Sequence, residues 1–84
     1  MVKRLALESQ EEELLRLARE RVALPTGKLR PKYQPDVDML LVELKENPAP
    51  TNSKDDVERG LIFNYEGQKL VSIDILDLYG VYAS

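Results

Sequence analysis

The segment from Gly60 to Asp77 constrains the fold most, because two β-rich runs flank the dipeptide Glu66-Gly67. Runs of this kind around a glycine turn are typical of a β-hairpin. A two-residue turn at Glu66-Gly67 places Tyr65 opposite Gln68 and thereby sets every other pair of the two strands. The segment predicts two antiparallel strands in a defined register.

This register distributes the apolar side chains over both faces of the hairpin. One face receives Ile62, Val71, Ile73 and Ile75. The other face receives Leu61, Phe63, Tyr65, Leu70 and Leu76. An antiparallel sheet with one wetted face normally alternates between apolar and polar side chains, so two apolar faces predict that both are covered.

An amphipathic helix over residues 9–24 is expected to cover one of these faces. Ser9-Gln10-Glu11-Glu12 has the form of a capping box, which predicts a helix start at Ser9. An apolar stripe follows at helical spacing, and Pro25 and Gly27 end the run. The stripe consists of Leu14, Leu15, Ala18 and Val22. The preceding residues 3–7 fit either an earlier helical turn or a short strand.

The second face needs another cover, and the candidates are the basic connector that follows the helix or a second copy of the chain. Leaving a Leu or Phe side chain in water forgoes about 1.5–3 kcal/mol, so several such side chains matter to a small domain. We favour the second copy. The expected interface residues are Leu61, Phe63, Tyr65, Leu70 and Leu76.

The remaining segments complete a small antiparallel sheet. Residues 25–35 form a connector with one short extended piece near Leu29–Tyr33, and Met39–Leu44 form a strand. Residues 45–56 are expected to be a surface loop, and the hairpin strands span Glu58–Tyr65 and Lys69–Leu76. The predicted fold is α+β: one domain over residues 1–84, with an N-terminal amphipathic helix packed on a three- to four-stranded antiparallel β-meander.

Size and composition favour association. A chain of 84 residues has a core that gives marginal stability on its own. Small domains are usually reinforced by disulfides, a structural metal or association. There is no Cys and no His, so disulfides are excluded and the commonest nitrogen ligand of zinc is missing. No apolar run reaches the length of a secretory signal or a membrane span, and we expect a cytoplasmic protein that does not enter membranes.

Charge is unevenly distributed along the chain. Residues 1–34 carry a net charge of +3 and residues 35–84 carry −6. Opposite charges favour packing of the two parts on each other. The alternative is a nucleic-acid contact, or an antitoxin-like contact with a small protein partner. The residues that would make such a contact are Lys3, Arg4, Lys28, Arg30 and Lys32.

Catalytic and metal-binding patterns are weak. Asp36 and Asp38 could begin an oxygen-ligand set, but their spacing is not that of an EF-hand, and we expect Asp38 to bond neighbouring amides in a turn. Asp74 lies between two isoleucines and is expected to point away from them, toward solvent or the N-terminal basic residues. Gly67 is expected to supply a positive φ in the turn. No catalytic residue, metal or cofactor is predicted, and the protein is expected not to be an enzyme.

Three ordered segments carry a family resemblance: Tyr33–Val42, Gly60–Gly67 and Val71–Asp77. Together they resemble the small-protein family catalogued as domain of unknown function 2283. The resemblance implies a β-meander and a small bacterial, archaeal or cyanobacterial protein, and it implies no activity. The thirty or so residues before Tyr33 depart from the family pattern.

We therefore expect a non-enzymatic protein–protein interaction module that self-associates as a homodimer, with a small protein partner as a further possibility. The alternative is an antitoxin-like or nucleic-acid-linked regulator that uses the basic N-terminal part. Nucleic acid is the less favoured partner because the helix is followed by prolines and β-rich runs, where a ribbon-helix-helix repressor has its second helix.

Overall fold

The computed structural model describes the backbone of residues 2–80 and the side chains of residues 10–80. One helix precedes five strands. In chain order these are α1 (Val2–Arg21), β1 (Arg30–Gln34), β2 (Met39–Glu43), β3 (Asn52–Asp56), β4 (Leu61–Glu66) and β5 (Lys69–Ile75). The α+β class is confirmed, with five strands in place of the expected three to four.

Helix α1 is longer at its N-terminus than the sequence predicted. It begins at Val2, so Ser9 lies inside the helix and the predicted N-cap at Ser9 is wrong. The segment before Ser9 consists mainly of Lys, Arg, Leu, Ala and Glu, which are good helix formers, and the helix extends through it. Of the two readings for residues 3–7, the helical one is confirmed.

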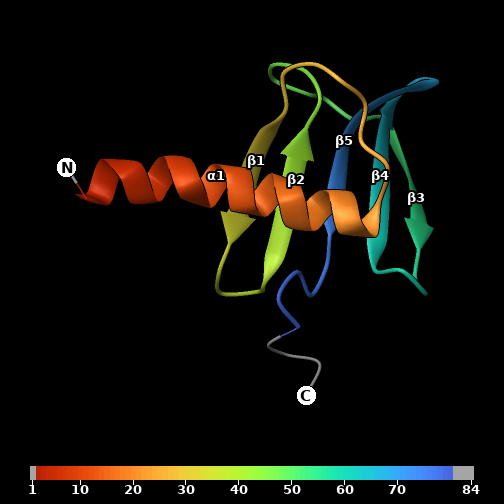
Figure 1. The fold of residues 1–84 in the computed structure, drawn as a ribbon. Coiled ribbons are helices and arrows are strands. Elements are labelled where there is room, and N and C mark those ends of the chain that lie inside the picture. The colour runs from red at the N-terminus through yellow and green to blue at the C-terminus, as the bar shows by residue number, and fades with distance from the viewer. Residues whose placement is uncertain (1, 81–84) are drawn as a thin grey trace.

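The five strands form one antiparallel sheet with the spatial order β1-β2-β5-β4-β3. Strands β3, β4 and β5 are joined as consecutive hairpins, and β2 reaches its place beside β5 through the long connection that precedes β3. The order β2-β5-β4-β3 is that of a Greek key, so the sheet is more than a simple meander. In Figure 1 the helix crosses one face of this sheet and its N-terminal half extends past β1.

Strand β3 was read as part of a loop because its sequence, Asn-Ser-Lys-Asp-Asp, is wholly polar. It pairs with β4 at the edge of the sheet, with Lys54 opposite Phe63. Charged side chains on an edge strand oppose pairing with other chains. A polar sequence without apolar alternation does not predict a strand, but it suits a strand at the edge of the sheet.

The register of the β4–β5 hairpin differs from the prediction. Glu66 pairs with Lys69, so the turn residues are Gly67 and Gln68, and Gly67 has the expected positive φ of 63°. A β-bulge between the Asn64 and Tyr65 pairs adds one residue to β5. Beyond the bulge, Phe63 pairs with Ile73 instead of Leu70. The predicted faces are therefore wrong for Ile73 and Ile75, whereas Leu61, Phe63 and Leu70 share one face as predicted.

The core lies between α1 and one face of the sheet. Leu14 and Ala18 of the helix contact buried side chains of the three central strands and of the segment after β5. Those partners are Leu40, Val42, Leu61, Ile73, Ile75 and Leu78. Ile73 and Ile75 share this face with Leu61. The register predicted from the sequence put these two isoleucines on the opposite face.

Arg21 fastens the end of the helix to the sheet. Its Nη2 donates hydrogen bonds to the carbonyl oxygens of Arg59 at 2.7 Å and Leu76 at 3.0 Å. Its Nη1 donates to the carbonyl oxygen of Asp77 at 3.3 Å. The C-terminal end of α1 is thereby held against the β3–β4 turn and the segment that follows β5.

Candidate functional site

The candidate site is the face of the sheet that α1 does not cover, which we call the open face. Side chains alternate between faces along each strand, and the strand pairing places the open-face residues in cross-strand rows. One row is Lys32, Leu41, Asp74, Ile62 and Asp55, and the next is Arg30, Glu43, Ser72, Asn64 and Ser53. No helix or strand among residues 2–80 covers this face, but Glu43, Ser72 and Asn64 of the second row are buried within the chain, so the first row is the accessible one.

The open face carries an apolar patch that consists of Met39, Leu41, Ile62 and Leu76. All four side chains are partly exposed, and none belongs to the core beneath the helix or packs against it. Leu41 and Ile62 both pair with Asp74, one from each neighbouring strand. The patch therefore surrounds a carboxylate at the middle of the sheet.

The polar side chains of the open face are joined by hydrogen bonds and an ion pair. The Ser53 hydroxyl donates to Asn64 Oδ1 at 2.8 Å, and Asn64 Nδ2 donates to Asp74 Oδ1 at 3.3 Å. Lys32 Nζ lies 3.3 Å from Glu43 Oε2. Among the described residues, no buried side-chain nitrogen or oxygen lacks a hydrogen-bond partner.

Asp74 is a partly buried carboxylate at the centre of this face. Burial between apolar neighbours raises its pKa, and the hydrogen bond from Asn64 acts in the opposite direction. Asp74 points to the open face, as expected, but its partner is Asn64 of β4 and not an N-terminal basic residue.

The structure places most of the predicted interface residues on the helix side. Leu61 is 1% exposed in the core, and Phe63 and Leu70 pack against the core. Tyr65 is partly exposed, with Lys54 Nζ 5.7 Å from its ring centre. Of the five, Leu76 alone lies on the open face. Met39 and Leu41 were not predicted as interface residues. They alternate with the core residues Leu40 and Val42 in a strand that is apolar throughout. Such a continuous apolar run indicates a strand that is covered on both faces.

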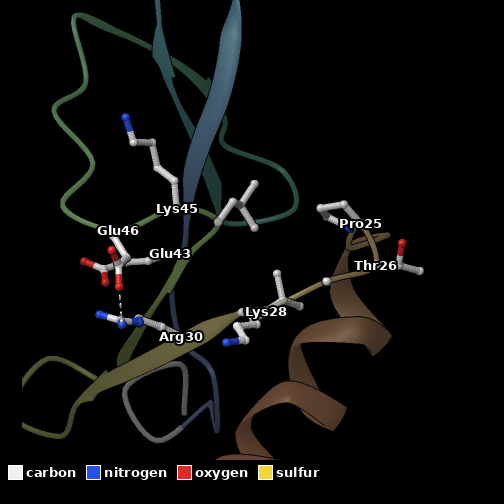
Figure 2. Close-up of a pocket in the computed structure, with 10 residues that line it drawn as sticks. Pro25, Thr26, Lys28, Arg30, Glu43, Lys45 and Glu46 are labelled. Atoms are coloured by element: carbon white, nitrogen blue, oxygen red, sulfur yellow. Dashed lines mark hydrogen bonds and ion pairs between the residues drawn. The ribbon is translucent and has the colours of Figure 1, made fainter.

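The basic residues do not gather into one positive patch among the described side chains. Lys3 and Arg4 lie in α1, and their side chains are outside the described part. Arg30 forms an ion pair with Glu46 at 3.1 Å, and Lys32 forms one with Glu43. Figure 2 shows Lys28 and Arg30 beside a cleft of about 470 Å³ that Glu43 and Glu46 also line. Carboxylates neutralise much of the charge that a nucleic-acid contact requires.

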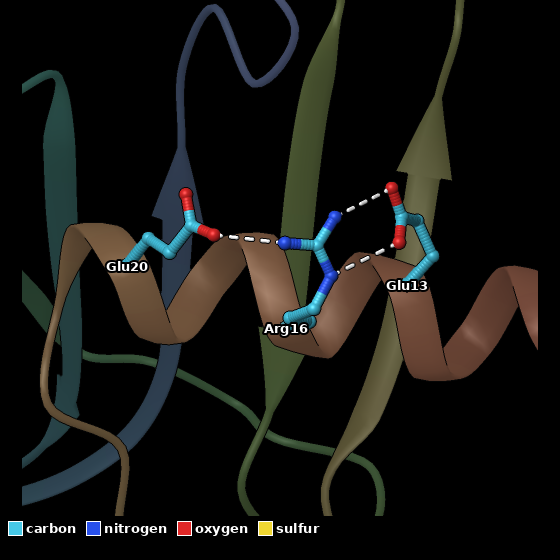
Figure 3. Close-up of polar contacts among 3 residues, drawn as sticks. All are labelled: Glu13, Arg16 and Glu20. Carbon is cyan, nitrogen blue, oxygen red and sulfur yellow. Dashed lines mark hydrogen bonds and ion pairs between the residues drawn. The ribbon is translucent and has the colours of Figure 1, made fainter.

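The outer face of the helix shows the same pairing of opposite charges. Arg16 bridges Glu13 at 2.8 Å and Glu20 at 2.9 Å, as Figure 3 shows. All three side chains are substantially exposed. Pairs of this kind at helical spacing contribute little to stability, because water screens exposed charges. They make this face a solvated surface.

Asp38 joins the β1–β2 turn to the C-terminal segment. It is 1% exposed and accepts hydrogen bonds from the Tyr33 hydroxyl at 2.6 Å and from the backbone amide of Tyr79 at 3.2 Å. The Tyr33 and Tyr79 rings meet edge to face with centroids 5.4 Å apart. Asp38 was expected to bond neighbouring amides, and its carboxylate accepts a hydrogen bond from the amide of Tyr79, 41 positions later. Asp36 is exposed.

No set of three or more Asp or Glu side chains that could hold a metal ion occurs among the side chains that the structure describes. No helix in the described part is long and apolar enough to cross a bilayer.

Comparisons with known proteins identify a family over the sheet. The model of the family described as "Protein of unknown function (DUF2283)" matches residues 31–78, which include all of β2–β5 and most of β1. Searches of the curated proteins and of the solved structures each found no match. Helix α1 lies wholly before the matched region.

Proposed function

Since the chain belongs to the DUF2283 family of proteins of unknown function, we propose that it is a non-enzymatic interaction module that self-associates through the open face of its sheet. The observation that carries the proposal is the patch of Met39, Leu41, Ile62 and Leu76, which lies outside the core. Burying apolar surface contributes about 25 cal/mol per Å², so covering this patch favours association.

The polar part of the open face supports the same proposal. Binding is costly when polar groups lose water without gaining partners. Here Ser53, Asn64 and Asp74 already bond one another, and Lys32 already pairs with Glu43. A second copy can therefore cover much of this face without leaving those groups unpaired.

The two edges of the sheet are poorer docking surfaces than the open face. Edge strand β1 contains Pro31 and Lys32, and edge strand β3 contains Lys54, Asp55 and Asp56. Proline and charged side chains are the devices by which edge strands avoid pairing with another chain. We therefore assign association to the face and not to the edges.

Adjacent residues of β4 provide a matched test. Ile62 points to the open face, whereas Phe63 packs against the core on the helix side. We expect Ile62→Lys to weaken self-association at least tenfold in sedimentation velocity, with a small change in the urea midpoint. Phe63→Lys is expected to lower the urea midpoint, because it introduces a charge next to the core.

A wild-type chain that sediments at 9.6 kDa across the whole accessible concentration range contradicts the proposal. So does an Ile62→Lys variant that associates as well as the wild type. Salt-sensitive retention on heparin or DNA that is lost on substituting Lys28 and Arg30 would favour the nucleic-acid reading instead.

A further inference from the structure

Building on the proposed function, we propose that two copies stack open face to open face about a two-fold axis parallel to β5, with Lys32 of each copy opposite Asp55 of the other. The charge pattern of the open face selects this arrangement. It also identifies the partner as a second copy, since the face is complementary to itself.

The strand order places side chains of opposite charge at the two edges of the open face. β5 is the middle strand of β1-β2-β5-β4-β3. The row that crosses the centre reads Lys32, Leu41, Asp74, Ile62 and Asp55 from β1 to β3. One end of this row is thus Lys32, which stays 61% exposed beside Glu43, the other end is the exposed carboxylate of Asp55, and the central residue is an acid with an apolar side chain on each side.

Aligned stacking of two sheets about a two-fold axis between them leaves two directions for that axis. An axis parallel to the strands places β1 of one copy over β3 of the other, so Lys32 meets Asp55. An axis perpendicular to the strands places β1 over β1, so Lys32 meets Lys32 and Asp55 meets Asp55. Like charges brought together across an interface are strongly unfavourable, which leaves the parallel axis. It also gives the near-aligned stacking that is common in β-sandwiches.

The same axis also matches the apolar part of the face. Leu41 of one copy lies opposite Ile62 of the other, and the central Asp74 residues lie opposite each other. Two facing carboxylates repel unless they share a proton. Burial already raises the pKa of Asp74 in the single chain, which eases such sharing. We therefore expect Asp74→Asn to tighten the dimer about threefold or more at pH 7.

The size of the face sets the expected strength. Five strands about 4.8 Å apart and about 17 Å long have a footprint of roughly 400 Å² per copy, which is below that of stable interfaces. We expect a weak dimer that is populated at tens to hundreds of micromolar. Sedimentation equilibrium over that range at about 50 mM salt is the appropriate measurement, because screening weakens exposed charge pairs.

Charge reversal tests the arrangement directly. Lys32→Glu and Asp55→Lys should each weaken the dimer about fivefold or more, because each creates two like-charge contacts between copies. An equimolar mixture of the two variants should restore association to near the wild-type level, because each variant then meets the opposite charge on the other. Lys32 and Asp55 lie on opposite edge strands, roughly 19 Å apart across the sheet, so rescue within one chain is negligible.

Lys54→Glu is the matched control. Lys54 neighbours Asp55 on β3 but pairs with Phe63 and so lies on the other face. Its reversal should leave the dimer constant within about twofold. Melting of every variant is measured in parallel, because Lys32→Glu also removes the ion pair with Glu43.

The outcomes separate this arrangement from the proposed function. Restoration in the mixture, together with a tighter Asp74→Asn dimer, supports the arrangement. Suppose that Ile62→Lys disrupts the dimer but the two charge-reversed variants do not restore association when mixed. That result overturns the arrangement and leaves the open face as the interface. A wild-type chain that stays monomeric at hundreds of micromolar overturns both.

Discussion

Asp38 combines two properties that a single residue seldom has: it is almost fully buried, and its φ is +52°. A positive φ is costly for most residues other than glycine, but Asn and Asp tolerate it. The conformation turns the carboxylate toward Tyr33 and the amide of Tyr79. The Asp38 carbonyl oxygen also accepts a hydrogen bond from the Leu78 amide at 3.0 Å. Asp38 thus links the β1–β2 turn to the C-terminal segment by hydrogen bonds.

We expect Asp38→Ala to lower the free energy of unfolding by about 2–4 kcal/mol, through unpaired buried groups and a strained φ. Asp38→Asn tolerates the positive φ and retains a carbonyl acceptor, so its loss should be about half as large. Urea denaturation followed by circular dichroism measures both. Equal losses in the two variants would contradict the assigned role of the backbone conformation.

At the scale of elements, the helix packs on the sheet through Ala18, which is completely buried in the core. Leu14 lies one turn earlier on the same face and is also buried. A small residue at the crossing point lets the helix backbone lie near the buried strands. Arg21 then fixes the end of the helix through three backbone carbonyls.

Ala18→Leu is expected to destabilise the protein by about 1–3 kcal/mol, because the added methylene groups overpack the contact. Ala23→Leu is the control, since Ala23 is exposed just after the helix and should change stability by less than about 0.5 kcal/mol. Thermal melting at a fixed low protein concentration compares the two. A stabilised Ala18→Leu variant would show that the contact has unfilled space.

At the scale of the whole molecule, the segment outside the family match supplies one side of the core. Residues 31–78 contain Leu40, Val42, Leu61, Ile73 and Ile75, and the helix before them contributes Leu14 and Ala18. Without the helix this face of the sheet keeps only partial cover, from Leu24 and Leu29 of the connector and from Leu78. The extension is therefore part of the folded unit and not an appendage.

A chain that starts at residue 25 is expected to lose cooperative unfolding and to aggregate, because five buried side chains of the sheet become exposed. Adding a peptide of residues 1–24 should restore a cooperative transition. The control is a chain that starts at Ser9, which retains every residue of the described core and should unfold cooperatively. A cooperative transition of the residue-25 chain at the full-length midpoint would contradict this role of α1.

The amino-acid sequence alone was sufficient for the helix, the hairpin, the strand at Met39 and the family, because each rests on a local pattern of side chains or on an ordered set of such segments. The polar strand β3 could not be predicted in this way. Its pairing with β4 is what makes it a strand, and no apolar alternation marks it.

Which side chains share a face was decided by the tertiary structure. The bulge in β5 shifts the register by one residue and moves Ile73 and Ile75 to the side of Leu61, whereas the changed turn at Gly67-Gln68 leaves the faces as predicted. A shift of one residue exchanges the two faces of a strand, because side chains alternate with a period of two. The candidate site depends on the bulge in the β4–β5 hairpin and on the long-range pairing of β5 with β2, which local sequence patterning does not encode.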